Sequence, residues 1–82
     1  MIKKMGERNG KGKEYNKYSD ELVFEGEYLN GKRNGKGKEY YDGELKFEGE
    51  YLNDNIYNGK FHDYKSKKIT ELKNGKRERI LW

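Results

Sequence analysis

The chain contains no cysteine and no proline. Without cysteine, disulfide bonds, thiol catalysis and cysteine-based zinc sites are excluded. Only 14 of the 82 residues are Leu, Ile, Val or Phe, and no apolar run approaches the roughly 18 residues that can span a bilayer. The basic residues near the start precede no apolar stretch, so we expect no secretory signal and a cytoplasmic protein. A chain of this length holds one small domain.

What the chain does contain is charge, glycine and aromatic rings. Charged residues make up 41% of it, with 19 basic against 15 acidic side chains and a net charge of +4. Such a mixed surface permits weak attraction to phosphate without requiring it. Eight Tyr, three Phe and one Trp supply most of the apolar area that folding can bury. Whether the chain folds therefore depends on how these residues are arranged.

The arrangement is repetitive. The segment Phe24–Asn30 recurs as Phe47–Asn53, and Gly6–Tyr15 recurs almost unchanged as Gly31–Tyr40. Internal repeats at this spacing predict units that each bury a face against the next one. We expect one domain over residues 1–82, divided into a partial repeat (6–23), a full repeat (24–46), a degenerate repeat (47–66) and a C-terminal cap (67–82).

Within a repeat, residues alternate as in a half-buried β-strand. Phe24, Gly26 and Tyr28 alternate with Glu25 and Glu27, and no apolar residues recur at helical spacing. The sequence therefore predicts an all-β fold, an antiparallel meander of roughly seven strands in one elongated twisted sheet, with about three repeats.

Two connections fix the expected register. A four-residue loop over 30–33 sets Gly26 opposite Gly37, with glutamates opposite lysines on either side. For the next connection a two-residue turn would mix charges with aromatics on one face. We therefore expect a three-residue loop over 41–43, which sets Gly37 opposite Phe47 and keeps each face uniform.

This register predicts two unlike faces. Glycines on the first face give large rings room to lie on the sheet. The rings and leucine expected on this face are Phe24, Tyr28, Leu45, Phe47 and Tyr51. The solvated face is expected to carry Glu25, Glu27, Lys36, Lys38, Glu48 and Glu50.

The same residues resemble the MORN repeat (membrane occupation and recognition nexus). The likeness rests on the pattern aromatic, Gly, aromatic, Asn-Gly and Gly-x-Gly in residues 24–37, repeated in 47–51 and 6–12, and it covers about residues 6–53. It extends to the variant MORN repeats of bacterial antitoxin-like proteins. The resemblance implies a row of β-hairpins in one elongated sheet, and its name suggests binding to anionic lipid. It is far more specific for fold than for function.

Catalysis has little support. His62 is the only histidine, and Asp63 beside it points to the opposite side of a strand, so no base and orienting group are paired. Ser19, Ser66 and Thr70 lie among charges without a nucleophile motif. We therefore expect no enzyme, no metal, no cofactor and no small-molecule substrate.

Two binding functions remain. An aromatic face on a thin sheet is typical of protein contacts or self-association, which favours a protein-interaction or scaffolding module. The alternative is peripheral binding to anionic phospholipid head groups, to which basic side chains contribute. Nucleic-acid binding is disfavoured because rings and lysines lie on opposite faces. The candidate binding residues are Lys32, Arg33, Lys36, Lys38, Phe24, Tyr28, Phe47 and Tyr51.

Overall fold

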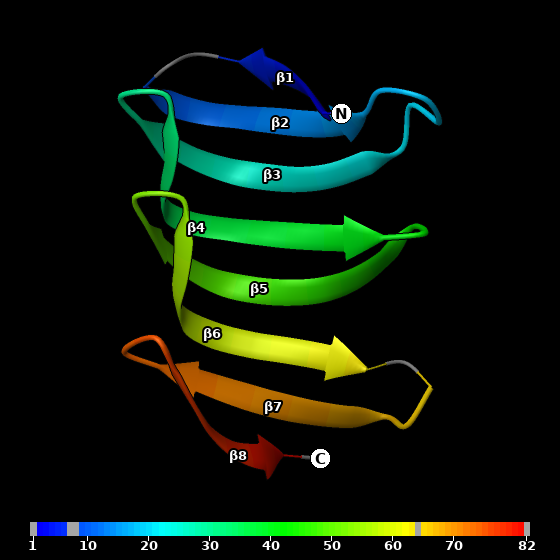
Figure 1. The fold of residues 1–82 in the computed structure, drawn as a ribbon, viewed down its shortest axis with the longest axis vertical. Helices are drawn as coiled ribbons and strands as arrows, with labels where there is room; N and C mark the ends of the chain where they lie inside the picture. Colours follow the sequence, from blue (N-terminus) through cyan, green and yellow to red (C-terminus); the bar gives the residue numbers. More distant parts are fainter. Residues whose placement is uncertain (1, 7–8, 64, 82) are drawn as a thin grey trace.

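The protein folds as a single antiparallel sheet in which every strand pairs with the next one along the chain (Figure 1). The computed structural model describes residues 2–6, 9–63 and 65–81. Over these residues the sheet has eight strands, one more than expected, because residues 2–6 also pair with the repeat that follows. The strands are β1 (Ile2–Gly6), β2 (Gly10–Asn16), β3 (Leu22–Leu29), β4 (Lys32–Tyr41), β5 (Glu44–Leu52), β6 (Asn55–Asp63), β7 (Lys68–Lys73) and β8 (Lys76–Leu81).

The predicted fold class is confirmed. The described residues form one open meander, because consecutive hairpins extend the sheet in one direction and its first and last strands stay apart (Figure 1). The decayed region after Asn53 still completes a full strand, β6, and β7 and β8 continue the sheet beyond it. No helix in the described part of the chain is long and apolar enough to cross a membrane.

The central register is as predicted, but both loops are shorter than expected. Gly26 lies opposite Gly37, and Glu25 opposite Lys38. The β3–β4 turn has only two central residues, Asn30 and Gly31, with φ angles of 53° and 79°. Positive φ at both positions is the pattern of a type I′ turn, which matches the right-handed twist of a hairpin.

A bulge explains why a wrong loop gave a correct register. Between the pairs Gly26–Gly37 and Tyr28–Arg33, β4 carries two more residues than β3. The two-residue turn and these two extra residues together take up the four residues assigned to a loop. Bulges bend a strand and increase its twist. The first residues of β4 accordingly run across the strand direction before they join the sheet (Figure 1).

The β4–β5 connection corrects a second prediction. It is the two-residue turn Asp42–Gly43, not a three-residue loop, and one extra residue on β5 beside Tyr40 and Leu45 restores the parity that the turn alone would break. Gly37 consequently lies opposite Gly49, not Phe47. The principle that each face stays uniform was right, but the bulge and not the loop satisfies it.

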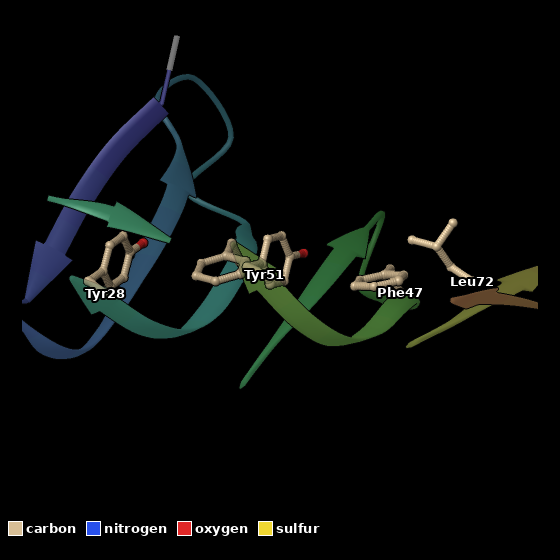
Figure 2. Packing of buried hydrophobic residues seen from close by; sticks show 5 residues of the cluster. Tyr28, Phe47, Tyr51 and Leu72 are labelled. Atoms are coloured by element: carbon tan, nitrogen blue, oxygen red, sulfur yellow. The ribbon is translucent and has the colours of Figure 1, made fainter. Parts of the chain in front are cut away.

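The rings form the core on one face of the sheet. Phe24 has no exposed surface and packs against Tyr28 and Tyr51. Tyr28, Tyr51, Phe47 and Leu72 lie in a row along the sheet (Figure 2). Successive rings meet edge to face, with centroids 5.1–5.7 Å apart, an arrangement that aromatic pairs favour. Leu45 is only half-buried. The described core consists of Phe24, Tyr28, Phe47, Tyr51 and Leu72, with Ile56 and Phe61 packed against it.

Candidate functional site

The face opposite the rings carries an open trough of about 1070 Å³. It crosses β2 to β6, and glycine backbone forms its floor while charged side chains form its two walls. The floor consists of Gly12, Gly26, Gly37, Gly49 and Gly59, which lie opposite one another in successive strands. The walls consist of Lys11, Lys13, Glu25, Glu27, Lys36, Lys38, Glu48, Glu50 and Lys60.

The core dictates this glycine floor. A Cβ on Gly37 would lie 2.6 Å from the Phe24 ring and 2.9 Å from the Tyr51 ring. A Cβ on Gly49 would lie 2.0 Å from the backbone oxygen of Asn58. Only glycine allows rings and neighbouring backbone to approach so closely. Side chains alternate between the two faces of a strand, so these glycine positions face the rings and the trough between the charged rows has only backbone at its floor.

The walls alternate in sign from strand to strand. On one wall Lys13 lies opposite Glu25, and the alternation continues through Lys38, Glu48 and Lys60. Each such cross-strand pair contributes a few tenths of a kcal/mol to the sheet.

The second wall shows the same alternation. Lys11 lies opposite Glu27, and Lys36 opposite Glu50. At the bulge the backbone N–H of Lys36 donates to Glu27 Oε1 at 2.7 Å, which holds the wall together where the ladder is interrupted. Each of the strands β2 to β5 therefore presents two like charges, one on either side of its glycine.

The basic residues predicted to bind ligands separate into different environments. Lys36 and Lys38 are exposed and belong to the trough, each with glutamates on the two neighbouring strands. Lys32 is exposed at the β3–β4 turn, outside the trough. Arg33 points to the opposite face, into the ring cluster.

Arg33 joins a polar network between the rings. Its Nε and Nη2 donate to the two carboxylate oxygens of Glu14, at 2.8 and 2.9 Å. Its guanidinium lies 4.0 Å from the centre of the Phe24 ring, a cation–π distance, and its Nη1 is 3.5 Å from Glu39. Burial opposes the charge, but the hydrogen bond and charge of Glu14 outweigh it and raise the pKa of Arg33. Arg33 thus has its charge satisfied inside the protein.

Tyrosine hydroxyls complete the network. Tyr28 donates to Glu14 at 2.6 Å, and Tyr51 donates to Glu39. Burial, followed by the hydrogen bond to the carboxylate, raises the pKa of both phenols. On the trough face, Tyr40 donates to Glu25 at 2.7 Å, and burial and this bond raise the pKa of Tyr40 to about 12. These phenols therefore stay protonated and act as donors at neutral pH.

The four aromatic binding candidates lie in the core. Phe24, Tyr28, Phe47 and Tyr51 are at most 7% exposed. The expectation that their face is offered to a partner is therefore corrected: the rings are covered within the chain, where Arg33 and Ile56, from the starts of β4 and β6, pack against them. The face that carries a concave surface is instead the charged one, which the sequence predicted to be solvated.

His62 lies beside the trough. Its Nε2 is buried and 3.4 Å from Glu48 Oε1. Asp63 instead accepts hydrogen bonds from the backbone of its own loop, at Lys65 and Ser66. Within the described residues, no group of three or more His, Asp and Glu side chains is placed to hold a metal ion.

Three asparagines have a structural role that the repeat pattern did not predict. Asn9, Asn34 and Asn58 each accept a hydrogen bond through Oδ1 from the backbone N–H of the turn residue in the following hairpin, at 2.9, 3.2 and 2.9 Å. These hydrogen bonds, an asparagine ladder, tie the β3–β4, β5–β6 and β7–β8 turns, which lie at the same end of the strands, to the preceding repeat. The available signal was an Asn-Gly pair that recurs at the same place in each unit but lies outside a turn.

Fold and trough together define a class of protein, an open single-layer array of β-hairpins with a ring core on one face and a charged, glycine-floored trough on the other. No family model, curated protein or solved structure matches the chain.

Proposed function

We propose that this chain is a non-catalytic interaction module whose trough binds a protein partner. The observation that carries the proposal is the trough itself, which crosses five strands with no side chain on its floor. Its walls carry charges of alternating sign, which suit a partner that presents charges of both signs.

The residues with reactive side chains favour a non-catalytic role. The Oγ of Ser19 accepts a hydrogen bond from the N–H of Glu21, and the Oγ of Ser66 accepts one from that of Lys68. Both hydroxyls stabilise turns, an ordinary use of serine.

Anionic phospholipid is the alternative ligand, and the charge distribution disfavours it. Lys36 and Lys38 alternate with glutamates on both neighbouring strands, so a flat anionic surface would meet both signs. Arg33 is committed to Glu14. A polybasic patch adds about 1 kcal/mol per cation near such a surface, and the interleaved carboxylates oppose that gain.

A library of random peptides, selected against the immobilised chain, tests the proposal. Enriched peptides should bind the parent and lose most of their affinity for Lys38→Gln/Glu48→Gln, which neutralises two adjacent wall positions. The matched control Lys65→Gln/Glu44→Gln makes the same change at exposed positions outside the trough. Backbone amide shifts in NMR spectra should map the bound peptide to β2–β6.

Two outcomes would contradict the proposal. One is a failed selection, in which no peptide is enriched or the enriched peptides bind the parent and Lys38→Gln/Glu48→Gln equally. The other is sedimentation of the chain with phosphoinositide-containing vesicles that persists at physiological salt, which would support the lipid alternative.

A further inference from the structure

The charges along the trough repeat with a period of two strands. Within β2–β5 each even-numbered strand presents two lysines and each odd-numbered strand two glutamates, one on either wall. Neighbouring strands lie about 4.8 Å apart, so charges of one sign recur along the trough about every 9.6 Å. A ligand that pairs with both signs needs the same period.

An α-helix lying across the strands has nearly this period. It rises about 1.5 Å per residue, so residues seven apart share one side of the helix at intervals of about 10.5 Å. The mismatch of about 0.9 Å per repeat is small beside the length of Lys, Arg and Glu side chains. An extended chain directs residues to one side about every 6.7 Å, so its charges would fall out of step with the strands.

The trough has room for side chains of this helix but not for its backbone. The two walls are two residues apart along each strand, about 6.7 Å at the backbone, whereas a helix is about 10–12 Å across. A helix above the second wall can direct long side chains into the trough. A basic side chain there reaches both glutamates of one strand, such as Glu25 and Glu27. An acidic side chain reaches both lysines of the next strand, Lys36 and Lys38.

Two exposed leucines flank the second wall with the same two-strand period. Leu29 follows Glu27 by two residues on β3, and Leu52 follows Glu50 by two residues on β5. Residues two apart on a strand share a face, so each leucine lies on the trough face beside its glutamate. Leu29 and Leu52 are 51% and 50% exposed. A helix above the second wall would cover both of them.

The leucines fix the register of such a helix. Two residues before Lys11 and Lys36, the chain has Asn9 and Asn34, whose Oδ1 atoms accept hydrogen bonds from turn N–H groups. An apolar ligand residue therefore meets an exposed leucine only at β3 and β5, the strands whose glutamates require basic partners. A helix shifted by one strand would face like charges and lose both leucines.

We infer that the partner segment is an α-helix with a seven-residue repeat, in which an apolar residue adjoins a basic one and an acidic residue lies about half a repeat away. The helix crosses β2–β5 above the second wall. Its apolar residues contact Leu29 and Leu52, and its charged side chains enter the trough. This inference rests on the proposed function and specifies the partner of the same site.

Two peptides of identical composition test the charge order. One has three copies of Lys-Leu-Ala-Ala-Glu-Ala-Ala, and its isomer has every Lys and Glu exchanged, both with neutral caps and a fluorescent label. Anisotropy titrations at low salt should show the first binding at least about fivefold tighter, because the isomer cannot satisfy the charges and the leucines together. The isomer has the better order of Glu and Lys for helix formation, so low helicity cannot explain its weaker binding.

The leucine contacts are tested by a double variant of the chain. Leu29→Ser/Leu52→Ser should weaken binding of the first peptide about fivefold, since it removes apolar contacts that the helix would bury. The matched control Tyr18→Ser/Tyr41→Ser removes two exposed apolar side chains at the other end of the strands and should leave binding unchanged.

A second variant should change the charge preference. In Lys11→Glu/Lys36→Glu the second wall is acidic on β2–β5, so preference should shift to the peptide in which Lys replaces every Glu. That gain of binding cannot come from a variant that fails to fold. The control Lys65→Glu/Lys67→Glu makes the same change in net charge outside the trough and should keep the preference of the parent.

Failure of the inference and failure of the proposed function give different results. If library peptides bind in the trough but the two designed peptides bind equally or not at all, the helical partner is overturned and the interaction module stands. The same holds if the bound peptide is not helical in isotope-edited NMR spectra. If no peptide of either kind binds and the chain instead pellets with vesicles, both are overturned.

Discussion

The first and second halves of the sheet bury the same kind of ring row with different chemistry. Opposite Tyr28 in the first half lies Arg33, whereas opposite Tyr51 in the second half lies Ile56. Phe24 lies between Glu14 and Glu39, and Phe47 lies between Glu39 and Phe61. The first half thus places an ion pair where the second half places apolar side chains, while both halves use a tyrosine hydroxyl as a donor to a carboxylate.

The comparison shows that turns and glycines, rather than the residues that fill the core, define this fold. The backbone of both halves has two-residue turns and aligned glycines. The two halves differ in what stabilises them. The second half is stabilised by burial of apolar side chains. In the first half, the attraction between Glu14 and Arg33 must offset the cost of removing both charges from water. The two halves should therefore respond differently to mutation.

The largest expected effect is loss of a ring shared by both halves. Phe47→Ala removes a side chain that is 2% exposed and should lower the free energy of unfolding by about 3–5 kcal/mol. Urea unfolding followed by tryptophan or tyrosine signals measures it. Leu52→Ala, at a half-exposed position, is the control and should change stability by less than about 0.5 kcal/mol. Equal losses in the two variants would contradict the core assignment.

Removing one partner of the Arg33–Glu14 ion pair should lower stability nearly as much as Phe47→Ala. Replacing both partners by apolar residues should not lower it. Arg33→Ala leaves the Glu14 carboxylate buried without its bidentate partner and should cost about 3 kcal/mol. Glu14→Met/Arg33→Met/Tyr28→Phe makes the first half apolar like the second, and should be neutral or stabilising relative to the parent. If the triple variant were less stable than Arg33→Ala, the two halves would not be interchangeable in this way.

Alkaline pH should weaken the contacts of the tyrosine hydroxyls in both halves. The folded state raises the pKa of Tyr40 from 10 to about 12, and raises those of Tyr28 and Tyr51 in the same direction. Above pH 10 the unfolded chain releases these protons first, so this contribution to stability is complete below pH 10 and is lost as pH rises toward 12. Thermal melts at pH 8 and 11 measure the loss. Tyr28→Phe/Tyr51→Phe should reduce it, whereas Tyr57→Phe, at a more exposed ring, should not.

The smallest expected effect concerns the asparagine ladder, which both halves share. Asn58→Ala removes the acceptor for the N–H of Asn74 and should cost about 1 kcal/mol. Asn55→Ala, at an exposed position near the same edge, is the control and should be close to neutral. Hydrogen exchange at the amide of Asn74 should quicken only in the first variant, and equal exchange in both would count against the ladder.

Sequence patterning predicted the sheet better than the site. The pairing of Gly26 with Gly37, and the separation of rings from charges, followed from period-2 alternation and cross-strand charge. The position of Arg33 did not, because residues 30–33 suit a loop, whereas β4 begins at Lys32 and pairs Arg33 with Tyr28 on the ring face. Nothing local in the sequence marks a bulge in β4, where the residues involved also suit a loop.

The sequence by itself determined the repeat, the all-β meander and its two unlike faces, since these depend on local alternation and turn residues. Only the tertiary structure decided that the rings are buried within the chain and that the charged face carries a trough. The starts of β4 and β6 bring Arg33 and Ile56 against the rings, and the glycine-to-glycine register aligns the charged side chains in two rows with bare backbone between them. Both results come from the contact between strands, which no single strand contains.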